Sequence, residues 1–127
     1  MSKYTYSTND RGIEQLNKKV FILLMNLGFR LTSIGTVYLK NIILISYINK
    51  NDDLSYSQCI KILSKEINKS AVTIKSNIFK CFDTVDRKKY LKTFPLIFKY
   101  DTDLSSITPL NLYESFSALL QLKDSTI

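Results

Sequence analysis

The sequence predicts an all-α protein, a compact bundle of about six helices that contains a helix-turn-helix. The 127 residues include only three Gly and two Pro, too few for the many tight turns of a β-sandwich or barrel. Hydrophobic residues make up 45% of the chain and charged residues 23%, which is the balance of an ordinary folded domain. Apolar residues also recur at helical spacing in several segments.

The chain is expected to open with a flexible N-terminal arm, residues 1–8, because these residues are polar and unpatterned. Residues 9–127 are then expected to form a single helical domain with one core. Asn9 or Asp10 can cap its first helix. That helix ends at Gly28 and has an apolar stripe at i, i+3, i+4 and i+7, made of Ile13, Leu16, Val20, Leu23, Leu24 and Leu27.

A short link that ends at Gly35 leads into the second predicted helix. Its apolar residues are Val37, Leu39, Ile42, Ile43 and Ile48. The segment 42–48 is rich in β-branched residues, which favour strands. No partner strand is evident in the sequence, so a helix is predicted, followed by a polar loop over 49–54.

Residues 55–85 predict two short helices joined by a tight turn. Ser55 and Gln58 have the spacing of a capping box. The helix that they open buries Cys59, Ile60, Leu63 and Ile67. A turn at 68–69 follows, and Ser70 caps the next helix, which runs to the end of this segment. Two helices with so brief a connection predict a helix-turn-helix.

The C-terminal part predicts two short helical pieces and one longer helix. The pieces, 87–92 and 96–100, lie on either side of Pro95, since proline interrupts a helix. The last helix begins with Thr108 as cap and Pro109 in the first turn. Its apolar residues are Leu112, Phe116, Leu119 and Leu120.

The net charge of +7 is concentrated in one part of the sequence. Residues 61–92 contain three acidic and nine basic residues. The basic ones are Lys61, Lys65, Lys69, Lys75, Lys80, Arg87, Lys88, Lys89 and Lys92. A localised positive charge favours a polyanionic partner. The alternative is a lysine-rich composition inherited from an AT-rich genome, but composition alone would not cluster the charge.

The helix that Ser70 opens has one face suited to the major groove of DNA. At 100° per residue its buried face comprises Ile74, Ile78, Cys81, Phe82 and Val85. The opposite side is centred on Ser76, with Thr73, Lys80, Asp83 and Arg87 beside it, and is mostly small, polar and basic. Hydroxyls and free amides at a helix start also bind phosphates. The candidate DNA-binding residues are Lys69, Ser70, Thr73, Lys75, Ser76, Lys80, Arg87, Lys88 and Lys89, and the alternative is an ordinary solvated face.

Phe79 is the unusual residue of this helix, because it flanks the polar side. Three interpretations stay open from the sequence. The ring extends the core by folding back onto the first helix of the bundle, it packs against a thymine methyl group in the major groove, or it anchors a protein partner.

Three segments resemble the C-terminal effector domain of the stage-zero sporulation protein A response regulators. The first is similar to the family's "IG…IKGY.YLR.AI" stretch and contains Leu27-Gly28, Ser33-Ile34-Gly35, Tyr38-Leu39 and Ile42. The second, residues 59–85, aligns without a gap onto the family's helix-turn-helix. The third is similar to its "FGYT…PTN.EFIA…L" tail and contains Phe98, Tyr100, Pro109 and Asn111. The resemblance covers residues 13–123.

This resemblance implies a six-helix bundle in which residues 72–85 form the recognition helix of a transcription regulator. The chain departs from the family where bases would be contacted. The family has Arg at the positions of Ser76 and Phe79, Glu at Lys75 and His at Lys80. The strongest guanine contacts are therefore missing, and the receiver domain that regulates the family has no counterpart here.

The function predicted from the sequence is sequence-selective binding of double-stranded DNA, with a homodimer on tandem sites as an option. The alternative is a protein-interaction module that keeps the fold and binds or antagonises a related regulator. No enzyme, cofactor or metal site is expected, because the chain has no His and neither Cys59 nor Cys81 has metal-ligand spacing. Without a signal peptide or a membrane-spanning segment, the expected location is the cytoplasm.

Overall fold

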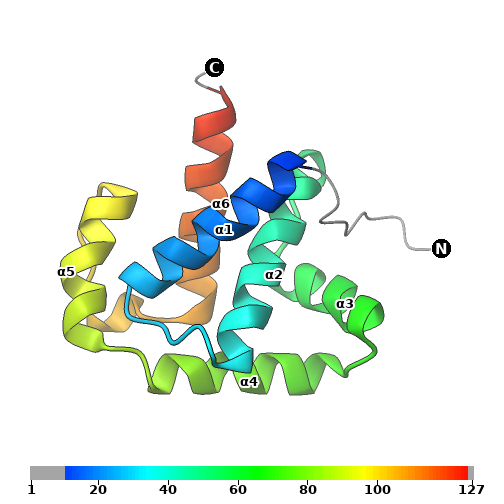
Figure 1. Cartoon of the computed structure of the whole chain (residues 1–127), viewed down its shortest axis with the longest axis horizontal. Helices are drawn as coiled ribbons and strands as arrows, with labels where there is room; N and C mark the ends of the chain where they lie inside the picture. Colours follow the sequence, from blue (N-terminus) through cyan, green and yellow to red (C-terminus); the bar gives the residue numbers. More distant parts are fainter. Residues whose placement is uncertain (1–10, 126–127) are drawn as a thin grey trace.

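The computed structural model describes residues 11–125, and within them the protein is all-helical (Figure 1). The elements are α1 (Arg11–Asn26), α2 (Ile34–Ile48), α3 (Tyr56–Ile67), α4 (Ala71–Asp83), α5 (Arg87–Phe98) and α6 (Pro109–Ser125), with two 3-10 turns, η1 (Lys50–Asp52) and η2 (Leu104–Ser106). The all-α bundle of six helices is thus confirmed. The expected arm, residues 1–8, and the proposed caps Asn9 and Asp10 lie outside the described residues.

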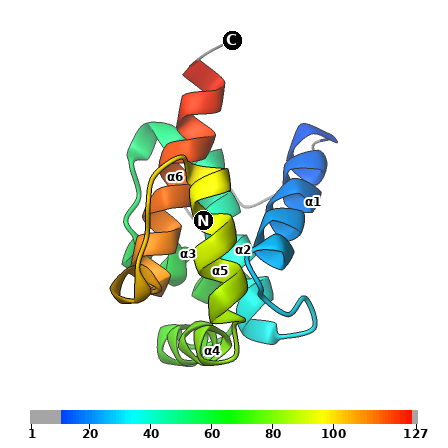
Figure 2. The same cartoon turned by 90° about the vertical axis from the view of Figure 1, so that its left-hand side faces the viewer.

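Helix α2 forms the centre of the core. Helices α1, α3, α4 and α6 all pack against it, and Figures 1 and 2 show it surrounded by them. The residues 42–45 of its apolar run are buried on every side. A helix that is hydrophobic all round is stable only when neighbours cover each face, which explains why a β-branched segment forms a helix here. The helix begins at Ile34, so Gly35 belongs to its first turn and not to the preceding link.

Helix α1 ends as its sequence predicts. Gly28 adopts a left-handed conformation with φ of +105°. Its N–H donates to the carbonyl of Met25 at 3.0 Å, and the N–H of Phe29 donates to the carbonyl of Leu24 at 3.1 Å. These two bonds form a Schellman motif, which satisfies the last carbonyls of the helix. The chain then turns towards α2 with Phe29 buried.

The prediction of a break at Pro95 is wrong, because α5 runs through it as one helix. Tyr90, Phe94 and Phe98 follow each other at i+4 and are all buried. Their rings are close, with centroids 5.6 Å apart for the first pair and 4.6 Å for the second. Burial of this aromatic column on both sides of Pro95 outweighs the one backbone hydrogen bond that proline removes.

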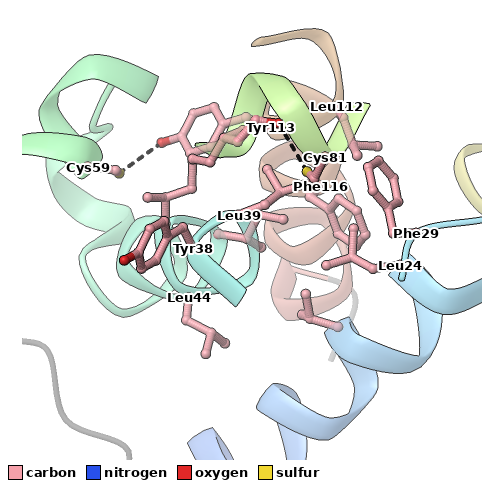
Figure 3. Close-up of a cluster of buried hydrophobic side chains, with 14 of the residues drawn as sticks. Leu24, Phe29, Tyr38, Leu39, Leu44, Cys59, Cys81, Leu112, Tyr113 and Phe116 are labelled. Atoms are coloured by element: carbon pink, nitrogen blue, oxygen red, sulfur yellow. Dashed lines mark hydrogen bonds between the residues drawn. The ribbon is translucent and has the colours of Figure 1, made fainter. Parts of the chain in front are cut away.

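Helix α6 is fixed to the start of α3 by Tyr113, a buried tyrosine. Its hydroxyl donates to the carbonyl of Leu54 at 2.6 Å and lies 3.2 Å from Sγ of Cys59 (Figure 3). The predicted start of the helix is confirmed, since Oγ1 of Thr108 accepts from the N–H of Asn111 at 3.1 Å. The beginning of α6 is thereby placed next to α3 and α4, where Figure 2 shows the connecting segment beside α4.

Candidate nucleic-acid interface

Helices α3 and α4 have the local structure that their sequence predicts. At the start of α3 the N–H of Ser55 donates to the Gln58 side chain at 2.8 Å, and the N–H of Gln58 donates to the Ser55 hydroxyl at 3.2 Å. This is a complete capping box. Asn68 ends α3 in the left-handed conformation with φ of 55°, and the Ser70 hydroxyl caps α4 by accepting from the N–H of Thr73 at 3.1 Å. Three residues therefore connect the two helices.

Helix α4 lies along the outside of the bundle, with one side anchored and the other side open. Its inner residues Ile74, Ile78, Cys81 and Phe82 are buried, as predicted. Close contact with α2 fixes its position, because a Cβ on Gly35 would lie only 2.1 Å from the carbonyl oxygen of Asn77. Figures 1 and 2 show the helix across the base of the molecule with no other element below it. The anchored helix thus presents its outer side to solvent.

All nine candidate DNA-binding residues are exposed and lie on or beside α4. Lys69 and Ser70 precede the helix, and four further residues are on it: Thr73, Lys75, Ser76 and Lys80. The other three, Arg87, Lys88 and Lys89, are the first residues of α5, which begins close to the end of α4 (Figure 1). The structure therefore brings them to one side of the molecule, with cations at both ends of α4.

The hydroxyls at the start of α4 are already hydrogen-bonded within the protein. Ser70 Oγ donates to Thr73 Oγ1 at 2.8 Å, in addition to its bond from the Thr73 N–H. A hydroxyl has one hydrogen to donate, and the Ser70 hydroxyl already donates its hydrogen to Thr73. Thr73 keeps its O–H for an outside acceptor. At α5 the carboxylate of Asp86 caps the helix by accepting from the N–H of Lys89 at 3.1 Å.

The positive charge of the segment 61–92 is at the surface. Each of its nine basic side chains is exposed. Lys61 and Lys65 are on α3, Lys75 and Lys80 on α4, and the rest in the turn or on α5. The cations of this segment are consequently spread over three consecutive helices, with α3 and α5 near opposite ends of α4 (Figure 1).

Phe79 does not extend the core onto the first helix, so that interpretation is wrong. Its side chain is 63% exposed. It borders an open hollow of about 310 Å³, whose lining residues are Tyr56, Lys75, Phe79, Thr108, Pro109 and Leu110. The start of α6 forms one wall of this hollow, about 30 residues away in the sequence. No periodicity within α4 could have revealed that neighbour.

Chemistry outside this region is limited to a few buried groups. Burial raises the pKa of both thiols, Cys59 and Cys81, from 9.0 to about 11, so they are poor nucleophiles. Lys40 on α2 is 8% exposed and its Nζ lies 4.6 Å from the centre of the Phe21 ring, while desolvation lowers its pKa. Between residues 11 and 125 no set of three or more metal-binding side chains is grouped together. No helix in that range has the length and apolar character needed to cross a bilayer.

A comparison of the chain with protein-family models, with curated proteins and with solved structures finds no match. The resemblance to the sporulation effector domains stays a prediction from the three segments described above.

Proposed function

We propose that the protein is a sequence-selective regulator of transcription that binds double-stranded DNA, with α3 and α4 as a helix-turn-helix and α4 in the major groove. The observation that carries the proposal is the exposure of the whole outer side of α4 between two groups of cations. The helix has 13 residues and is therefore ~20 Å long at 1.5 Å per residue. Because that length exceeds the ~12 Å width of the major groove, the helix would lie along the groove, with the cations at its ends near the phosphates that border it.

The residues have distinct roles in this proposal. Lys69 at one end of α4 and Arg87, Lys88 and Lys89 beyond the other end neutralise phosphates. Ser76 and Lys80 face the bases, because they lie within 40° of the centre of the outer side. The similarity to the sporulation effector domains supports the same assignment of α4, while Ser76 in place of Arg implies a different target site.

A salt titration of duplex binding tests the proposal. Neutralising the four phosphates assigned to these cations gives a plot of log affinity against log salt with a slope of roughly −4. Lys80→Ala should reduce the preference for a selected duplex over random DNA. Lys89→Ala should weaken both complexes equally, since phosphates carry no sequence information.

Lys18→Ala, an exposed lysine on α1, is the matched control and should change neither complex. The absence of duplex binding at low salt, or an affinity that is independent of salt, would contradict the proposal. Equal effects of the two variants on both kinds of DNA would assign Lys80 to a phosphate.

A protein-interaction module is the second candidate function, and the hollow beside Phe79 favours it. The exposed side chains of Phe79 and Leu110 and the half-buried ring of Tyr56 would bury apolar area against a partner, and aromatic anchors contribute strongly to protein interfaces. In that case duplex binding is absent and Phe79→Ala abolishes a protein complex.

A further inference from the structure

Two large apolar side chains are exposed on the outer side of α4. Val72 is 77% exposed and Phe79 is 63% exposed. They are seven residues apart and therefore only about 20° apart around the helix. The two side chains are two turns apart, with Lys75 and Ser76 on the turn between them, so they are two separate apolar contacts on one side of the helix. Because cations lie at both ends of α4 and Asp83 is the acidic residue on this side, a polyanion is the partner that the net charge favours.

The polar groups on α4 that could recognise a base edge are few. The amide of Asn77 could form two hydrogen bonds with one adenine. Its Nδ2–H, however, already donates to the main-chain carbonyl of Thr73 at 2.9 Å. The Thr73 hydroxyl accepts from Ser70 at 2.8 Å and keeps only its own hydrogen to donate. Ser76, Lys80 and Asp83 are the exposed polar side chains near the centre of the face. Asp83 can only accept, as from the amino group of cytosine, and none of the three makes the bidentate contact of arginine with guanine. Hydrogen bonds alone therefore discriminate weakly between bases here.

The apolar group that the major groove offers is the C5-methyl of thymine. We infer that α4 selects its DNA through thymine methyl groups packed against Val72 and Phe79, an inference that rests on the proposed DNA-binding function. For a helix lying along the groove, seven residues rise ~10.5 Å, which corresponds to about three base-pair steps of ~3.4 Å. The preferred site thus contains two thymines about three steps apart.

The surroundings of Phe79 suit this role. Tyr56 on α3 and Pro109 and Leu110 on α6 line the hollow on one side of its ring. Packing against these neighbours would limit the directions that the ring can adopt, so less conformational freedom would be lost when a methyl group packs against its open side. Val72 is β-branched and correspondingly stiff.

Replacing thymine by deoxyuridine tests the inference, because it removes only the methyl group. A duplex that the protein selects from a random pool is prepared with thymine or with deoxyuridine at each position. Each methyl that contacts the protein should contribute about fourfold in affinity, the value for burying one such group. In Val72→Ala or Phe79→Ala the corresponding deoxyuridine should lose its effect. Leu96→Ala, an exposed apolar residue on α5, is the matched control and should keep the full effect.

The outcomes separate this inference from the proposed function. Salt-dependent binding of a selected duplex with an effect of deoxyuridine that disappears in Val72→Ala or Phe79→Ala supports both. Binding that is indifferent to deoxyuridine, or an effect that persists in both variants, overturns the thymine contact and leaves DNA binding intact. Failure to bind any duplex at low salt overturns both and leaves Val72 and Phe79 to a protein partner.

Discussion

Replacing Gly35 by alanine should separate α2 from α4, the two helices whose contact positions the outer face. The added Cβ would lie 2.1 Å from the carbonyl oxygen of Asn77 and 2.9 Å from Cβ of Cys81. Real Cβ atoms essentially never approach a neighbour within 3.0 Å. The carbonyl belongs to the interior of α4 and cannot rotate away, so the whole helix has to move by about 1 Å relative to α2.

The expected cost follows from two opposing contributions. Overpacking of a close contact costs about 1–3 kcal/mol, and a displacement of a whole helix belongs at the upper end. Alanine is better than glycine inside a helix by about 1 kcal/mol. The free energy of unfolding of Gly35→Ala should therefore fall by about 2 kcal/mol, which lowers Tm by roughly 8 °C for a chain of this size.

Thermal denaturation followed by circular dichroism measures this change. Gly12→Ala is the matched control, since Gly12 is an exposed helical residue of α1, and its Tm should stay the same or rise slightly. A Gly35→Ala variant that melts at or above the wild-type temperature would refute the close α2–α4 contact.

Further predictions concern buried polar groups. Tyr113→Phe leaves the carbonyl of Leu54 unpaired and should lower the free energy of unfolding by about 1–3 kcal/mol. Tyr90→Phe should be neutral or stabilising, because that buried hydroxyl bonds to no other described residue. A urea titration of both variants measures the two changes, and an equal loss of unfolding free energy in the two variants would contradict this assignment. Stability should also fall as pH rises from 9 to 11. The folded-state pKa of Cys59 and of Cys81 is raised from 9.0 to about 11, so the unfolded chain loses these protons first. Replacing both by alanine should flatten the profile between pH 9 and 10, and an unchanged profile there would exclude the thiols as its cause. Above pH 10 a decline should remain, because burial also raises the pKa of Tyr56, Tyr90 and Tyr113 from 10.0.

The features predicted correctly from the sequence are those that neighbouring residues determine. The capping box of Ser55 and Gln58, the glycine end of α1 at Gly28 and the cap at Thr108 each depend on groups within five residues. The burial of Ile74 and Ile78 follows from helical periodicity alone. Such signals also sufficed to predict the two helices at 55–85.

The features that the sequence did not reveal depend on contacts between distant residues. The continuous α5 results from burial of Phe94 and Phe98, which outweighs the local effect of Pro95. The surroundings of Phe79 depend on Leu110, which is brought near only by the packing of α6. The need for glycine at position 35 is likewise explained by close contact with Asn77 of another helix. From the sequence around it, Gly35 was predicted only to end a link.

Adding one negative charge to the middle of the outer side of α4 tests the central proposal most directly. Ser76 is exposed at that point, and glutamate is a good helix former, so Ser76→Glu should fold normally. Gln15→Glu adds the same charge to α1, whose first half lies far from α4 (Figure 1). With a Debye length of ~10 Å at 0.1 M salt, only the charge close to the DNA is felt strongly.

The measurement is the affinity of the two variants and the wild type for one duplex at 0.1 M salt. If α4 enters the major groove, Ser76→Glu should bind at least about tenfold more weakly, while Gln15→Glu should stay within about twofold of the wild type. Equal affinities for the two variants would contradict DNA binding through α4.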